Sequence, residues 1–129
     1  MRCYIDASAA AKLIRSEPES DALADFLEAR TETMGIVSSM LLETELRRIA
    51  VREHAPQTSV TEVLQGISLV EPERAHFHAA GIFPGVGLRS LDALHLVTAM
   101  RAEADVMVAY DQRLLVAAAS LGMATISPQ

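Results

Sequence analysis

Four acidic residues from separate parts of the chain occupy positions where carboxylates can do chemistry. They are Asp6, Glu45, Asp92 and Asp111. Asp6 and Asp111 each follow a short apolar run directly and precede a segment of helix-forming residues. In an α/β protein such a junction is the carboxyl end of a parallel strand, where the edge of the sheet can hold a ligand. The sequence therefore predicts two carboxylates at the same edge.

The other two acids lie in helical segments whose apolar residues indicate burial. Asp92 is in the first turn of segment 90–103, which is apolar on nearly every side, and Glu45 falls within an apolar stripe between Leu41 and Ile49. Two carboxylates about 5 Å apart repel by roughly 3 kcal/mol at an effective dielectric near 20. Acids that converge in this way need a cation, and oxygen ligands favour Mg²⁺ or Mn²⁺ over zinc or copper.

Each acid also has a purely structural interpretation. The two acids that follow strands are typical helix N-caps, and Asp92 is a first-turn acid that the helix dipole favours. Glu45 is within reach of Arg48 for an ion pair. Glu43, which neighbours Arg47 at helical spacing, is the better candidate for a solvated acid. The combination of four acids, rather than any single one, favours a functional site.

The elements that must position these acids alternate along the chain. Strands are expected over 3–5, 34–37, 67–70, 106–110 and 124–126, and helices over 8–15, from 17 onward, from a cap at Ser38-Ser39 to His54, and over 58–65, 72–80, 90–103 and 112–121. This alternation predicts a single α/β domain over 1–129, with a mostly parallel central sheet and helices on both faces.

Composition narrows the function classes. The formal charge of −6 argues against a general nucleic-acid coat, yet it is compatible with a nuclease whose site gathers carboxylates. Cys3 is the only cysteine, so an internal disulfide and a Cys/His zinc cage are excluded, and its place in the first strand predicts a buried thiol. The sequence has no apolar run of membrane-spanning length and no basic-then-apolar start, so we expect a cytoplasmic protein without a membrane partner.

Four motifs, in this order and at these separations, resemble the PIN-domain ribonucleases, most closely the VapC-like toxins of toxin–antitoxin pairs. They are Tyr-Ile-Asp6-Ala-Ser, Ser39-Met-Leu-Leu-Glu-Thr-Glu45-Leu-Arg, Leu88-Arg-Ser-Leu-Asp92-Ala-Leu-His-Leu and Ala109-Tyr-Asp111-Gln-Arg-Leu. The resemblance covers essentially the whole chain. One departure is Ala109, where family members often carry a hydroxyl residue.

The resemblance implies a metal-dependent endoribonuclease. Asp6, Asp92 and Asp111 would bind Mg²⁺ or Mn²⁺, and Glu45 would position or deprotonate the attacking water. Helix-start hydroxyls would orient carboxylates or waters, and arginines would contact the RNA backbone. These further candidates are Ser8, Ser39, Arg47, Arg48, Arg89 and Arg113. His95, one helical turn after Asp92, is interpreted as a packed residue behind the site.

The family resemblance also implies partners. They are an RNA substrate (tRNA, ribosomal or messenger RNA), a small cognate antitoxin and a second copy of the chain in a homodimer. Two alternatives remain open. A non-catalytic PIN-like module would keep the fold for binding. A phosphoacceptor receiver domain shares the length and the α/β pattern, but it needs a lysine after its last strands, and the only lysine here is Lys12.

Overall fold

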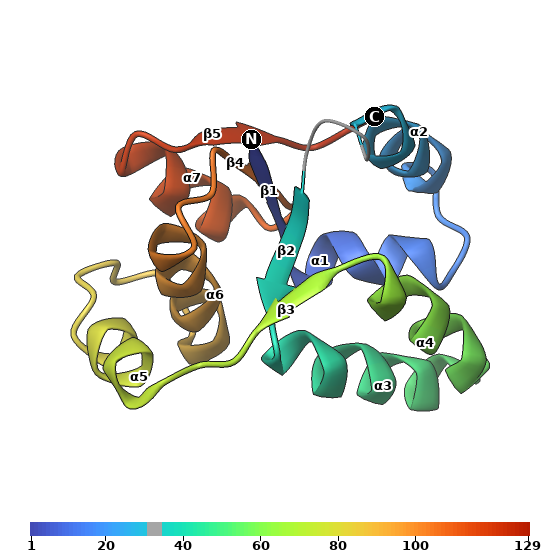
Figure 1. The fold of residues 1–129 in the computed structure, drawn as a ribbon, viewed down its shortest axis with the longest axis horizontal. Helices are drawn as coiled ribbons and strands as arrows, with labels where there is room; N and C mark the ends of the chain where they lie inside the picture. Colours follow the sequence, from blue (N-terminus) through green and yellow to red (C-terminus); the bar gives the residue numbers. More distant parts are fainter. Residues whose placement is uncertain (31–34) are drawn as a thin grey trace.

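The computed structural model describes residues 1–30 and 35–129, which form an α/β domain around a five-stranded parallel sheet (Figure 1). Its strands are β1 (Arg2–Ile5), β2 (Gly35–Ser39), β3 (Ser68–Val70), β4 (Val106–Val108) and β5 (Ala124–Ile126). They lie in the order β3-β2-β1-β4-β5, so β1 is central. Asp6, which follows Ile5, therefore stands in the middle of the carboxyl edge of the sheet.

Helices cover both faces of the sheet, as the alternating pattern predicts. They are α1 (Ala7–Ala10) with the 3₁₀ turn η1 (Ala11–Leu13), α2 (Ser20–Arg30), α3 (Leu41–Glu53), α4 (Gln57–Gln65), α5 (Arg74–Gly81), α6 (Ser90–Arg101) and α7 (Gln112–Ser120). In Figure 1, helices α1 to α4 lie on one side of the sheet, and α5, α6 and α7 lie on the other.

The side chains of β1 point alternately to the two faces of the sheet and pack against the helices on each. Cys3 and Ile5 belong to the core cluster formed with α1 to α4, whereas Tyr4 belongs to the cluster formed with α6 and α7. All three side chains are fully buried. Tyr4 therefore packs in the layer that also contains α6, the helix of Asp92.

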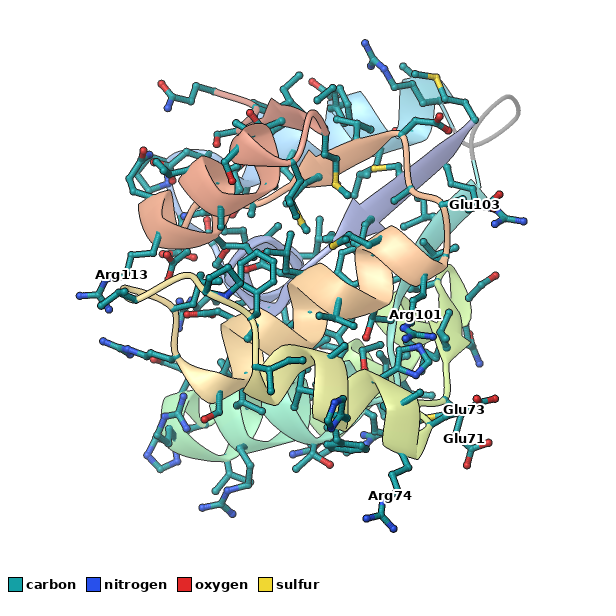
Figure 2. The ribbon with its side chains drawn as sticks, turned by 90° about the vertical axis from the view of Figure 1, so that its left-hand side faces the viewer. Glu71, Glu73, Arg74, Arg101, Glu103 and Arg113 are labelled. Atoms are coloured by element: carbon teal, nitrogen blue, oxygen red, sulfur yellow. The ribbon has the colours of Figure 1, made fainter. Side chains whose placement is uncertain are left out.

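The two ends of the molecule can be followed in Figure 2. Arg113, in the first turn of α7 just after β4, lies at one end, and Arg101 and Glu103, at the end of α6 just before β4, lie at the other. Because β4 runs between them, Arg113 marks the carboxyl edge of the sheet. The candidate acids must be sought at that end.

The expected N-cap at Ser38-Ser39 is wrong. Both serines are the last residues of β2, where they pair with Leu69 and Val70 of β3. The Ser38 hydroxyl donates to the Ile5 carbonyl over 2.6 Å, which ties β2 to β1 instead of starting a helix. Helix α3 begins directly after Met40, which has helical backbone angles and makes no side-chain cap.

Other element boundaries move by a few residues. β4 ends at Val108 instead of residue 110, because the next two backbone N–H groups bond outside the β1–β4 ladder, to the Ile126 carbonyl and the Ser8 hydroxyl. The first helix is split into α1 and η1, and α2 begins only at Ser20. The start of the strand expected over 34–37 lies outside the described residues.

Two further expectations concern membrane spans and the cysteine. Among the described residues, no helix is long and apolar enough to cross a bilayer. Cys3 is fully buried, as predicted, and burial raises the pKa of its thiol to about 11.

Candidate functional site

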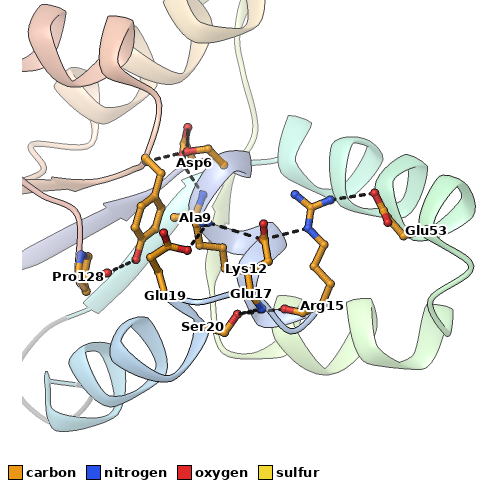
Figure 3. A network of polar contacts seen from close by, with 11 residues as sticks. Asp6, Ala9, Lys12, Arg15, Glu17, Glu19, Ser20, Glu53 and Pro128 are labelled. Carbon is orange, nitrogen blue, oxygen red and sulfur yellow. Dashed lines mark hydrogen bonds and ion pairs between the residues drawn. The ribbon is translucent and has the colours of Figure 1, made fainter.

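Asp6 is fixed at the carboxyl end of β1 by the Ser8 hydroxyl and the Ala9 backbone N–H. It caps α1 by accepting the Ala9 backbone N–H at 3.0 Å, as Figure 3 shows. The Ser8 hydroxyl lies 2.7 Å and 2.9 Å from its two carboxylate oxygens and also accepts the backbone N–H of Tyr110 at 2.9 Å. Ser8 thus joins the end of β1 to the segment that leads into Asp111. Burial raises the pKa of Asp6, and the bonds from Ser8 and Ala9 oppose this rise.

Asp111 caps α7 at the end of the neighbouring strand. Its carboxylate accepts the backbone N–H groups of Arg113 at 2.9 Å and Leu114 at 3.3 Å. The N-cap interpretation is therefore correct for both strand-following acids, and it places both at the carboxyl edge because β1 and β4 are adjacent and parallel. Capping and site formation are compatible, since each cap uses only part of a carboxylate.

Asp92 approaches Asp111 from the first turn of α6. Burial raises the pKa of Asp92, and the nearby carboxylate of Asp111 raises it further. Among the described residues, Asp92 Oδ2 is the one buried side-chain oxygen or nitrogen without a hydrogen-bond partner. Burying an oxygen of a charged group without a hydrogen-bond donor costs free energy. This atom is therefore a candidate to bind a cation or a hydrogen-bond donor of a ligand.

Glu45 is held by a histidine rather than by Arg48. Its Oε1 lies 2.6 Å from Nε2 of His95, and Nδ1 of His95 lies 2.7 Å from the hydroxyl of Tyr4. His95 is 2% exposed and Tyr4 is fully buried, whereas the Glu45 side chain is 18% exposed. The chain of contacts therefore runs from the buried sheet to a carboxylate that reaches solvent. The alternative pairing of Glu45 with Arg48 is not what the structure shows.

His95 lies between the acids. It lies near both Asp6 and Asp92, and it bonds Glu45 directly. Together with the approach of Asp92 to Asp111, this brings the four candidate acids into one neighbourhood built from β1, α3, α6 and the end of β4. Within the described ranges, however, no three His, Cys, Asp or Glu side chains stand close enough to hold a metal ion as they are placed. The acids are neighbours, but they do not form a closed cage.

The arginines of α3 divide into two kinds. The guanidinium of Arg47 donates to Glu43 at 3.0 Å, Gln57 at 3.1 Å and Thr61 at 3.3 Å, so it joins α3 to α4. Arg48 is exposed and lines a cavity of about 340 Å³ beside Glu45. Arg52, which none of the four motifs contains, lines the same cavity.

The remaining candidates lie at helix starts and at a strand end. Arg89 is the N-cap residue of α6, and its backbone N–H and its charge partly oppose the rise in the pKa of Asp92. Arg113 is exposed in the first turn of α7 and meets Asp111 through its backbone N–H. Ser39 is buried at the end of β2, and its hydroxyl accepts the Leu41 backbone N–H at 3.2 Å. Both arginines therefore border the acids, whereas Ser39 shapes the turn into α3.

A second group of charges is drawn beside Asp6 in Figure 3. Lys12 pairs with Glu19 at 3.0 Å and Glu17 at 3.7 Å and stands over the ring of Tyr110. Arg15 links Glu17 to Glu53 of α3. The only lysine of the chain is thus bound within a salt-bridge network and is not placed as a phosphoacceptor site requires.

Comparison with known proteins gives the family. A sequence model of the PIN domain matches residues 3–120. The chain is 43% identical over 131 residues to Ribonuclease VapC35 of Mycobacterium tuberculosis (strain CDC 1551 / Oshkosh), covering 97% of this chain and 96% of that protein. It is 37% identical over 128 residues, with the same coverage, to Ribonuclease VapC46 of M. tuberculosis (strain ATCC 25618 / H37Rv). The chain therefore belongs to the PIN-domain family, and its similarity to VapC ribonucleases extends over nearly its full length.

Solved structures share the fold. The crystal structure of VapBC2 from Rickettsia felis, bound to a DNA fragment from their promoter, has a chain that aligns with a TM-score of 0.79 at 14% identity, with complete coverage of both chains. VapC20 of M. tuberculosis, described as a Sarcin-Ricin loop cleaving toxin, aligns with a TM-score of 0.76 at 12% identity over 98% of this chain and 99% of that one. The predicted single PIN-like α/β fold is confirmed, and the receiver-domain alternative is wrong.

Sequence reasoning missed the bond between His95 and Glu45. Both residues are polar within helical stripes that the sequence indicates are buried. That predicted burial was the available signal, since buried polar groups are normally hydrogen-bonded. The pairing itself joins helices fifty residues apart and cannot be read from periodicity.

Proposed function

We propose that this protein is a metal-dependent endoribonuclease that hydrolyses RNA phosphodiester bonds and acts as the toxin of a type II toxin–antitoxin pair. Its membership of the PIN family and its 43% identity to a VapC ribonuclease support the reaction class. The observation that carries the metal requirement is the buried Asp92 Oδ2, which has no partner among the described residues and belongs to an acid close to a second carboxylate. A divalent cation would satisfy both features.

The donor set suits Mg²⁺ or Mn²⁺. Asp6, Asp92 and Asp111 offer only carboxylate oxygens, and these hard cations prefer oxygen ligands. Asp6 and Asp111 are held at the edge by their N-cap bonds, and Asp92 supplies the oxygen that has no donor. When bound, the cation lowers the pKa of a water and neutralises charge that develops on the phosphate.

We assign to Glu45 the proton of the attacking water. Its Oε1 is occupied by His95, and its side chain remains partly open to solvent. The second carboxylate oxygen is then the one available to accept a hydrogen bond from a water at the edge of the sheet. Arg48, on the wall of the adjoining cavity, would contact the RNA backbone, and Arg89 and Arg113 border the same edge.

The partners follow from the same family. The R. felis neighbour is a VapBC complex, and a cognate antitoxin that covers the acidic edge would suit the net charge of −6 of this chain. We extend this to a homodimeric toxin in the cytoplasm. An arginine of the antitoxin that reaches the carboxylates would block both metal and substrate.

Cleavage assays on purified protein test the function. Incubation with tRNA, ribosomal RNA and messenger RNA should give cleavage with Mn²⁺ or Mg²⁺ and none in excess EDTA. Glu45→Gln should abolish cleavage, and Glu43→Gln, a matched change on the same helix, should retain it because Glu43 pairs with Arg47 instead of facing the acids. Undiminished cutting in EDTA would contradict the proposal.

The same assay distinguishes the second candidate, a non-catalytic PIN-like binding module. The observation in its favour is that no three acids of the described chain stand in metal-binding proximity. A binding module would retain RNA or a partner without cutting any RNA at any metal concentration. Metal-dependent cleavage that is lost in Glu45→Gln would exclude it.

A further inference from the structure

Glu45 is the least constrained of the four acids by its own backbone. Asp6, Asp92 and Asp111 stand at or next to helix starts, where backbone N–H groups hold their carboxylates. Glu45 lies inside α3 on a longer side chain, so no helix-end N–H is available to fix it. Its carboxylate is instead fixed by the contact with His95.

His95 is itself immobilised. It comes from α6, one turn after Asp92, and lies edge-on to the Tyr4 ring with the ring centroids 5.8 Å apart and the planes at 73°. The side chains of Tyr4 and His95 are almost completely buried. The immobilised ring therefore fixes the Glu45 carboxylate of α3 relative to the central strand β1.

The donors and acceptors can be assigned from the network. The phenol of Tyr4 carries one O–H that can donate, and its oxygen lies 2.7 Å from Nδ1 of His95. If the O–H of Tyr4 donates to Nδ1, the ring proton resides on Nε2 and is donated to Glu45. Both short contacts are then satisfied, with Nδ1 as an acceptor, Nε2–H as a donor and Glu45 Oε1 as an acceptor.

We propose that His95 and Tyr4 are positioning residues for Glu45, and that the chain Tyr4 O–H to His95 Nδ1, then Nε2–H to Glu45 Oε1, leaves the second Glu45 oxygen aimed at the reacting water. This inference rests on the proposed nuclease function and deepens it. His95 does not touch the substrate. Its role is to fix one oxygen so that the other has a single direction, as partners behind ligating or catalytic groups do.

Two substitutions of His95 separate this role from simple packing. In His95→Gln the side-chain amide nitrogen can take the place of Nε2 and keep the bond to Glu45, whereas in His95→Asn the amide ends near the position of Nδ1 and cannot reach it. We expect His95→Asn to lower kcat about 10- to 100-fold with little change in KM, because the lost interaction orients a reacting group rather than the RNA. His95→Gln should keep a kcat well above that of His95→Asn.

The control is Thr98→Val. Thr98 is a fully buried residue of the same helix whose hydroxyl donates to the Leu94 carbonyl, so this change disturbs α6 without touching Glu45. Thermal melts of all variants compare their folding. Tyr4→Phe, which removes the donor to Nδ1, should lower kcat by less than His95→Asn, because the direct bond to Glu45 remains.

A spectroscopic readout does not depend on activity. Long-range ¹H–¹⁵N NMR of the metal-free protein should show His95 protonated on Nε2 and unprotonated on Nδ1. In Tyr4→Phe the fraction protonated on Nδ1 should rise, since nothing then demands a free lone pair there. A wild-type His95 that carries a proton on Nδ1 would overturn the assignment and the proposal with it.

Two kinetic outcomes would contradict the role proposed for His95. The inference is overturned if His95→Asn keeps the kcat of Thr98→Val, or if folded His95→Gln is as inactive as folded His95→Asn. Should the wild-type protein cut no RNA with either metal, the proposed function fails instead. The two failures are thus distinguished by the activity of the unaltered protein.

Discussion

Asp92 and Asp111 approach each other at the carboxyl edge of the sheet, and the Asp111 carboxylate, after burial, is what raises the pKa of Asp92. The two acids come from the starts of α6 and α7, helices that pack on the same face of the sheet and against each other. The fold therefore forces together like charges that a metal-free protein can relieve only by binding a proton.

Neutralising one acid should stabilise the metal-free protein. Asp6→Asn removes a charge that is 3% exposed while keeping an oxygen for the Ala9 N–H, so in EDTA we expect its free energy of unfolding to rise by roughly 1–3 kcal/mol. Burial of the charge is the main reason for the expected stabilisation, because burial is the largest cause of the raised pKa of Asp6. Thermal melts measure the effect.

Metal should reverse the order of the melting temperatures of the native protein and Asp6→Asn. Mg²⁺ or Mn²⁺ should raise the melting temperature of the native protein and affect Asp6→Asn much less, because metal that binds only the folded state shifts unfolding. If Asp6 were only a cap, Asp6→Asn would melt at the same or a lower temperature in EDTA, and both proteins would respond equally to metal.

The pH dependence of stability should reflect the raised pKa values of two acids. Asp6 and Asp92 both have raised pKa values in the folded state. The folded form holds their protons more tightly than the unfolded chain does, so their contribution is fully present below about pH 4, the unfolded pKa, and is lost as the pH rises through the folded pKa values.

Melts of the metal-free protein in EDTA, from about pH 4 to pH 8, test this. The native protein should lose stability toward neutral pH more steeply than Asp92→Asn does. Asp25→Asn, a change of an exposed acid on α2, should follow the native slope. Equal slopes for the native protein and Asp92→Asn would mean that Asp92 is not strained by its surroundings.

Arg48 and Arg47 should behave differently although they are adjacent in sequence. In a Glu45→Gln background that does not cut, Arg48→Ala should weaken RNA binding and reduce the slope of log affinity against log salt by about 0.7, the value for one lost phosphate contact on a single strand. Arg47→Ala should leave that slope unchanged and lower stability by about 1 kcal/mol, since Arg47 joins α3 to α4. Binding measured over a salt series, together with melts, compares the pair, and the opposite assignment of effects would refute it.

The proposed toxin role predicts that a cognate antitoxin binds this protein and relieves its toxicity. Co-expression with the neighbouring small gene should restore growth and yield a stable complex, and light scattering on the purified toxin should give the mass of a dimer. We expect the complex to protect the acidic edge, so that Mn²⁺ no longer shifts the melt. A toxin that stays monomeric and captures no such peptide would contradict this part of the proposal.

The parts of the site that follow strands were predictable from the sequence. Asp6 and Asp111 end adjacent parallel strands, and a local signal, an apolar run followed by an acid and a helix start, was enough to place them. The pairing of Glu43 with Arg47 followed from their spacing on one helix.

Features that depend on contacts between distant segments were not predictable. Ser38 and Ser39 have the composition of a helix cap, but pairing with β3 and the bond to Ile5 keep them in the sheet. The bond of Glu45 to His95 depends on how α3 and α6 are placed about the sheet, which no local pattern encodes.

The most direct test of the central claim, that the acids of the edge form a metal centre, is a calorimetric titration of the purified protein with Mn²⁺. We predict saturable binding to the native protein and to Asp25→Asn, and a loss of most of that affinity in Asp92→Asn, whose substitution replaces the charged group that carries the unpartnered Oδ2. Equal Mn²⁺ affinity in the native protein and a folded Asp92→Asn, or no binding to either, would contradict the account.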